Sequence, residues 1–137
     1  MSELTVGEKQ YVTGKVDTFT QLHLARKLGP SIPIVEGLID PRNAEKDKAV
    51  LTVLMLSHIS DVDAEFVIRK CLSVVHRRQG DGKPAKVQSP DGTLMFDDIT
   101  LSQMLELTVA VIEENLGDFF RTALASMAAQ PEQAANL

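Results

Sequence analysis

The sequence contains few of the residues on which many kinds of fold and site depend. It has one cysteine among 137 residues, no tryptophan, and only 4% aromatic side chains. One cysteine excludes a disulfide framework and any multi-cysteine zinc or iron–sulfur site, and it favours a reducing, cytosolic environment. The shortage of aromatic rings argues against a base-stacking surface for single-stranded nucleic acid.

Long apolar runs are also absent. No stretch approaches the roughly 18 consecutive apolar residues of a membrane-spanning helix. The chain starts Met1-Ser2-Glu3, which is acidic where a secretory signal is basic. We therefore expect a cytoplasmic protein that does not associate with membranes.

The composition, with 44% hydrophobic and 24% charged residues, is that of an ordinary globular protein. The length suits one domain. We expect a single helical domain over residues 1–130 and a flexible C-terminal tail over residues 131–137, where apolar residues are sparse.

The charge is unevenly distributed. Residues 1–90 contain 13 basic and 11 acidic side chains (+2), whereas residues 91–137 contain 1 and 8 (−7), which together give the net charge of −5. An acidic C-terminal third repels a phosphate backbone, so nucleic-acid binding is disfavoured. One basic cluster, at Arg77, Arg78, Lys83 and Lys86, leaves a small DNA-associated regulatory protein as the alternative function.

Turn-forming residues predict two small β-hairpins. The first lies within residues 1–16, where Gly7-Glu8 separates two short β-prone segments. The second lies in the loop over residues 79–96, where residues 86–87 and 93–95 flank a Ser-Pro-Asp-Gly turn.

Apolar periodicity predicts a mainly α fold, a compact helical domain of about five helices. The expected helices span residues 18–28, 44–56, 60–78, 101–116 and 118–127. The first begins with a Thr18/Gln21 capping box, the fourth with a Thr100/Gln103 capping box, and Gly117 kinks or interrupts the path between the last two. Residues 49–56 are apolar on every face, which is typical of a central helix buried in the core or against a partner.

Two further patterns refine these helices. Phe19, Leu22, Ala25 and Leu28 recur at helical spacing and predict the apolar stripe of the first helix. The basic run over residues 76–78 suits the C-terminus of the third.

Residues that could act as nucleophiles, metal ligands or acid–base catalysts are scattered along the sequence. Cys71 lies on the apolar face of its predicted helix, so we interpret it as a core residue. The three histidines show no metal-ligand spacing, and the adjacent carboxylates Asp97-Asp98 and Glu113-Glu114 are explained by helix capping and solvation. We expect no catalytic residue, no cofactor and no metal. A small-molecule-binding or enzymatic helical domain is a third possibility, but it requires a pocket with perturbed titrating groups that the sequence does not indicate.

The helices carry more apolar surface than one core face requires. Candidate partner-binding residues are Phe66, Leu107, Val111, Phe119 and Phe120. Either a compact bundle buries them all, or they form a face for an oligomer or a partner segment.

Three segments resemble the tail assembly chaperones of long-tailed bacteriophages. They are YVTGK at residues 11–15, a segment over residues 19–30 that contains LHLARKL, and FDDITLSQM at residues 96–104 with NLGDFF at residues 115–120. The resemblance implies a mainly helical protein of the infected or lysogenic cell's cytoplasm that is absent from the mature virion. It also implies two partners, the tape measure protein, which the chaperone keeps soluble, and the tail tube protein, whose subunits it helps to recruit.

Overall fold

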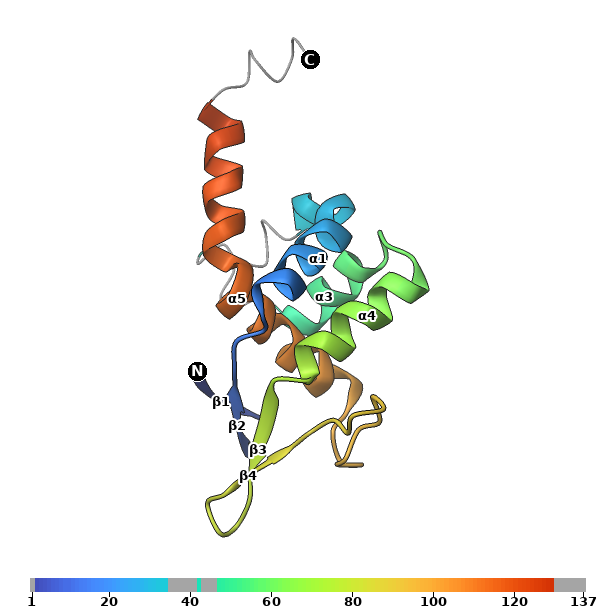
Figure 1. Cartoon of the computed structure of the whole chain (residues 1–137), viewed down its shortest axis with the longest axis vertical. Helices are drawn as coiled ribbons and strands as arrows, with labels where there is room; N and C mark the ends of the chain where they lie inside the picture. Colours follow the sequence, from blue (N-terminus) through green and yellow to red (C-terminus); the bar gives the residue numbers. More distant parts are fainter. Residues whose placement is uncertain (1, 35–41, 43–46, 130–137) are drawn as a thin grey trace.

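The computed structural model describes residues 2–34, 42 and 47–129. Within these residues, four α-helices and one 3-10 turn accompany a four-stranded sheet (Figure 1). The elements are, in chain order, β1 (Ser2–Val6), β2 (Lys9–Thr13), α1 (Thr18–Leu28), η1 (Gly29–Ser31), α3 (Lys48–Leu56), α4 (Asp61–Leu72), β3 (Val75–Arg78), β4 (Pro84–Lys86) and α5 (Leu101–Ala129). The mainly α class is confirmed, whereas the expected number of five helices is wrong. The predicted tail at 131–137 and the predicted helix start at 44–46 lie outside the described residues.

The sheet is antiparallel throughout, in the order β1-β2-β3-β4. The predicted N-terminal hairpin is present: Val6 pairs with Lys9 across a two-residue turn in which Gly7 has φ +63°. A positive φ at the first turn residue favours glycine and is typical of a type II′ turn.

The predicted second hairpin is reduced to an isolated bridge, and a hairpin that was not predicted precedes it. β3 and β4 pair around residues 79–83, and β2 pairs with β3 so that Thr13 lies opposite Val75. The predicted Ser-Pro-Asp-Gly turn follows, with a bridge between Gln88 and Leu94. Only the first predicted hairpin therefore belongs to the sheet, and the second is present as a turn with one bridge.

The predicted helical end over residues 76–78 is wrong. Helix α4 ends at Leu72, where the Ser73 hydroxyl donates to the Lys70 carbonyl. Residues 75–78 form β3, in which Val75 and Arg77 are buried and alternate with half-buried neighbours. This burial period of two is that of a strand. Pairing with β3 also satisfies backbone groups of β2 that would be left at an open edge if residues 75–78 continued the helix.

The predicted division into two helices at Gly117 is also wrong, because α5 is one helix of 29 residues and about 43 Å, whereas a kink at Gly117 stays a prediction. Gly117 has no positive φ, so it does not terminate the helix. A glycine inside a helix costs about 1 kcal/mol. Burial of Leu116 and Phe120 on either side offsets that cost.

One of the two predicted capping boxes is present. Thr100 N–H donates to the Gln103 side chain at 3.1 Å, and Gln103 N–H donates to the Thr100 hydroxyl at 3.2 Å. Helix α1 is instead capped by Asp17, whose carboxylate accepts from Thr20 N–H at 2.7 Å. Asp is as good an N-cap as Thr, so the helix begins at the predicted residue with a different cap.

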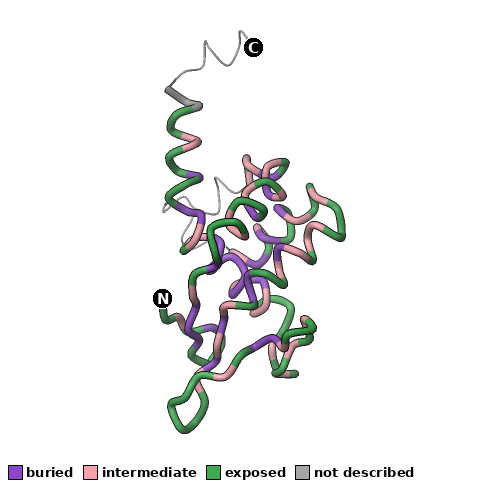
Figure 2. The backbone as a smooth tube through the Cα atoms, in the orientation of Figure 1, coloured by how far each residue is buried: buried purple, intermediate pink, exposed green. Residues whose placement is uncertain are grey.

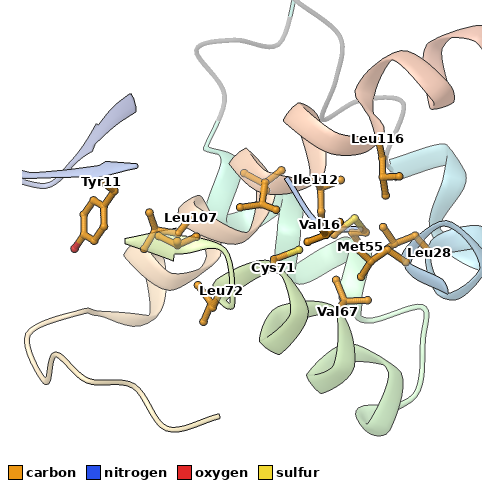
Figure 3. Packing of buried hydrophobic residues seen from close by; sticks show 14 of the residues in the cluster. Tyr11, Val16, Leu28, Met55, Val67, Cys71, Leu72, Leu107, Ile112 and Leu116 are labelled. Carbon is orange, nitrogen blue, oxygen red and sulfur yellow. The ribbon is translucent and has the colours of Figure 1, made fainter. Parts of the chain in front are cut away.

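The centre of the domain is α5, which packs against α1, α3, α4 and β1. Helix α3, expected to be central, buries only Ala49, Thr52 and Met55, and its other side is exposed. Buried side chains from α3, α4 and α5 meet in one cluster that includes Met55, Cys71 and Ile112 (Figure 3). Burial of Cys71 is as predicted, and it raises the thiol pKa to about 12.

Arg77 of β3 binds the loop that precedes α5. Its guanidinium donates to both carboxylate oxygens of Asp98, at 2.6 and 2.9 Å, and lies 4.4 Å from the centre of the Phe96 ring. These bonds hold the pKa of Asp98 below its ordinary value of 3.8. A bidentate, partly buried pair of this kind fixes geometry more firmly than a surface ion pair.

The Arg77–Asp98 pair predicts a loss of stability in acid. A carboxylate whose pKa is lower in the folded state stabilises the fold fully above its unfolded pKa, and that contribution is lost as the pH falls through the folded pKa. We expect Asp98→Asn to reduce the dependence of the unfolding free energy on pH between about pH 5 and pH 2. Urea titrations at several pH values measure this, with Asp97→Asn as the control; equal curves for both variants would contradict the assignment.

Candidate functional site

A shallow apolar groove lies between α1 and the second half of α5. It is a hollow of about 220 Å³ lined by Thr18, Gln21, Leu22, Ala25, Asn115, Leu116 and Phe119, and we call it the α1–α5 groove. Beyond it, α5 extends away from the rest of the domain (Figure 1), and most of that extension is exposed (Figure 2). The groove therefore lies where the domain body meets a projecting helix.

Asn115 sets the distance between the two sides of the groove. Its side-chain oxygen accepts from Val16 N–H at 3.0 Å, and its amide nitrogen donates to the Gly14 carbonyl at 3.2 Å and to the Val111 carbonyl at 2.9 Å. Gln21 of α1 also donates to the Asn115 oxygen, at 3.4 Å. One α5 side chain thus holds the linker that leads into α1.

Two large apolar side chains, Leu22 and Phe119, line the groove, and a third, Phe19, lies next to Leu22 on α1. Phe19 is 78% exposed, Phe119 59% and Leu22 53%. Phe19 and Leu22 are three residues apart and so are neighbours on the surface of α1. Exposed apolar side chains that gather at one place, unlike scattered ones, mark interaction surfaces.

The five predicted partner-binding residues are distributed between core and surface. Leu107 and Val111 are fully buried and Phe120 is 3% exposed, so these three belong to the core. Phe119 reaches the groove and contacts Phe120 edge-to-face, with ring centres 5.6 Å apart. The structure thus brings only Phe119 of the five to the groove.

Phe66 has a different environment. It is partly buried, and Lys27 and Lys70 lie over its ring, 4.8 and 5.7 Å from the centre. Lys27 also pairs with Asp63 at 2.7 Å, which joins α1 to α4. Two ammonium groups over one ring make this surface polar, in contrast to the groove.

Two features of the exposed surface were missed by the sequence analysis. Phe19 and Leu22 belong to the predicted apolar stripe of the first helix, but α1 exposes both and buries Leu24, together with Leu28 of that stripe. Helix α3 exposes Val50, Val53 and Leu54, each about half exposed, on a single face. The only available signal was that these helices carry more apolar residues than one buried face needs.

The basic cluster is largely neutralised. Arg77 pairs with Asp98, and Arg78 pairs with Glu3 of β1. Only Lys83 and Lys86 of the four are without an ion pair among the residues that the structure describes. Duplex binding needs several free cations on one surface, so this arrangement does not favour the DNA-associated alternative.

The described residues that line the groove include no titrating side chain. Among the described residues, no group of three or more His, Cys, Asp or Glu side chains is placed to hold a metal ion. The buried Cys71 thiol, with its raised pKa, lacks the thiolate character of a nucleophile. The described helices include none that is long and apolar enough to cross a membrane.

Comparison with protein families gives a match over most of the chain. The model of the family described as "Phage tail assembly chaperone protein, TAC" matches residues 7–128, which include β2 to β4, helices α1, α3 and α4, all of α5 except Ala129, and the groove, whereas β1 precedes the matched range. A comparison with curated proteins found no match, and a comparison with solved structures found none either. Membership of a chaperone family indicates a non-enzymatic role. Because the match covers far more than half of its length, the chain belongs to the phage tail assembly chaperone family.

Proposed function

We propose that this chain binds the tape measure protein of a phage tail through the α1–α5 groove, keeps it soluble, and helps to recruit tail tube subunits. It acts in the cytoplasm of the infected or lysogenic cell and is left out of the mature virion. Family membership supports the general role. The observation that carries the binding site is the pair of exposed apolar side chains Leu22 and Phe119 that line one hollow, with the exposed Phe19 next to Leu22 on α1.

The groove suits an amphipathic helix better than a small molecule. Its walls are two helices, and an incoming helix can place apolar side chains between Leu22 and Phe119. The polar groups beside them are already engaged, because Asn115 and Gln21 bond to each other and to the backbone. A partner therefore gains mainly the burial of apolar side chains, at roughly 1.5–3 kcal/mol for each large one. Because the shallow groove takes few such side chains, the complex can dissociate during assembly.

Co-expression tests the function directly. The tape measure protein encoded beside this chain is produced with and without it, and the soluble fraction is analysed by size-exclusion chromatography with light scattering. We expect the tape measure protein to become soluble and to elute with this chain at a fixed stoichiometry. A tape measure protein that stays insoluble while this chain elutes alone would overturn the proposal.

Surface variants test the groove. Leu22→Asp and Phe119→Asp place a charge where the partner's apolar side chains would pack, and we expect each to weaken binding by about 10- to 100-fold. Val62→Asp is the matched control, because Val62 is 77% exposed but lies on α4. Circular dichroism verifies that all three variants retain helicity. If Val62→Asp weakens binding as much as the groove variants, the partner does not bind at the groove.

A further inference from the structure

We propose that the free edge of β1, with the hollow beside it, binds an extended segment of a partner protein that alternates apolar and basic residues. The bound segment adds a fifth strand to the sheet. This surface is distinct from the α1–α5 groove. The inference rests on the proposed function only in the choice of tail proteins as the source of the segment.

The backbone of β1 has unused hydrogen-bonding groups along its outer edge. β1 is an edge strand whose Val6 pairs with Lys9 next to a two-residue turn. In such a hairpin, Ser2, Leu4 and Val6 exchange bonds with β2, and the N–H and C=O groups of Glu3 and Thr5 point outward. Within the described residues no other backbone or side-chain group bonds to these outward groups. They can therefore form a ladder with an incoming strand.

The two edges of the sheet differ. β4, at the opposite edge, has only three residues and begins with Pro84, which has no N–H to donate. Short length and proline are common ways of preventing edge pairing in natural sheets. β1 has five residues and no proline, so it is the edge at which a strand can be added.

A hollow of about 470 Å³ adjoins this edge, between β1, the start of α3 and the middle of α5. Leu4 and Val6 of β1 and Val109 and Ala110 of α5 give it an apolar lining. The apolar side chains of an added strand project on one face at every second residue. They can therefore fill the hollow while the backbone pairs with β1.

Two carboxylates give the site its charge preference. Glu106 and Glu113 line the hollow, and neither has an ion pair among the residues that the structure describes. They are two turns apart on α5, about 10.5 Å. The other charged groups lining the hollow, Asp47 and Lys48, have opposite signs, so the lining as a whole is acidic. Complementarity therefore selects a segment with lysine or arginine, and it disfavours an acidic one.

Peptide binding followed by amide exchange tests the site. Overlapping 12-residue peptides that span the tail tube and tape measure proteins are screened against the full chain. We expect the bound peptides to alternate apolar and basic residues, and to slow exchange of the Glu3 and Thr5 amides at least tenfold. The amides of Leu4 and Val6, already bonded within the hairpin, should change little. Absence of any binding peptide, or binding that leaves Glu3 and Thr5 exchange unaltered, would overturn the inference.

Matched variants separate the two contributions to binding. Glu106→Gln combined with Glu113→Gln should weaken binding at least tenfold and reduce its salt dependence. Glu65→Gln combined with Asp97→Asn is the control, because it removes two charges away from the hollow and should leave binding unchanged. Thr5→Pro deletes an outward N–H, and Thr5→Val keeps it. Because Thr5→Pro also risks damage to the hairpin, a peptide methylated at alternate amide nitrogens removes the same ladder from the partner's side. Unchanged binding of the methylated peptide would contradict strand addition.

The outcomes for the two surfaces are distinguishable. If the tape measure protein fails to co-purify but a peptide protects Glu3 and Thr5, the proposed function fails and the strand site stands. If co-purification depends on Phe119 and no peptide protects β1, the proposed function stands and the strand site fails.

Discussion

Leu107→Ala is expected to lower the free energy of unfolding by about 2–5 kcal/mol. Leu107 is fully buried in the cluster that includes Tyr11, Leu72 and Ile112. Truncation removes three buried carbon atoms and leaves a cavity, and the cost depends on how far the neighbours can relax. Since α5 is packed on several sides, we expect little relaxation.

Chemical denaturation followed by circular dichroism measures this change. A loss of this size lowers the melting temperature by roughly 2–4 °C for each kcal/mol. Leu101→Ala on the same helix is the control, because Leu101 is 66% exposed and its truncation should change stability by less than about 0.5 kcal/mol. If Leu107→Ala behaved like the control, Leu107 would lie outside the core, and its predicted contact with a partner would again be tenable.

Local sequence signals predicted the elements that depend on neighbouring residues. The turn at Gly7, the Thr100/Gln103 capping box and the start of α1 each rest on side chains within a few positions of one another. Pairing of β2 with β3 joins residues more than 60 positions apart. No short-range pattern indicates such a pairing, and the basic run at residues 76–78 therefore predicts a helix end.

The same limit applies to the candidate site. Both Phe19 and Leu107 lie on helices with apolar periodicity, yet one is exposed and the other fully buried. Periodicity indicates that a helix has an apolar face, but the packing of the other helices decides which residues that face buries. Helix α3 shows this most clearly, because its apolar circumference predicted a central position and α5 occupies that position instead.

The pairing of Arg77 shows how charge is misjudged from sequence. Arg77 and Arg78 are adjacent in the chain, but in a strand they point to opposite faces and meet different carboxylates, Asp98 and Glu3. A run of basic residues therefore became two separate ion pairs. The apparent nucleic-acid surface depended on these residues sharing one helix end.

Asn115→Ala is expected to destabilise the fold by about 2–4 kcal/mol, because it removes several hydrogen bonds and leaves partly buried backbone groups without partners. The Val16 N–H and the Gly14 carbonyl both bond to Asn115. Without them, the linker between β2 and α1 is no longer held against α5. We therefore expect a second effect, in which the α1–α5 groove widens and binding through it weakens.

Two further variants distinguish these bonds from general effects on α5. Asn115→Asp keeps the acceptor for Val16 N–H but places a carboxylate oxygen against the Gly14 and Val111 carbonyl oxygens, so its unfolding free energy should fall below that of the wild type while Val16 N–H keeps its bond. Ser102→Ala, at an exposed polar position of the same helix, should change stability by less than about 0.5 kcal/mol. Amide exchange at Val16 is the most direct measurement, because its N–H bonds to the Asn115 side chain. Exchange at Val16 that stays equally slow in Asn115→Ala would show that another group holds the linker, and the groove would then owe its shape to apolar packing alone.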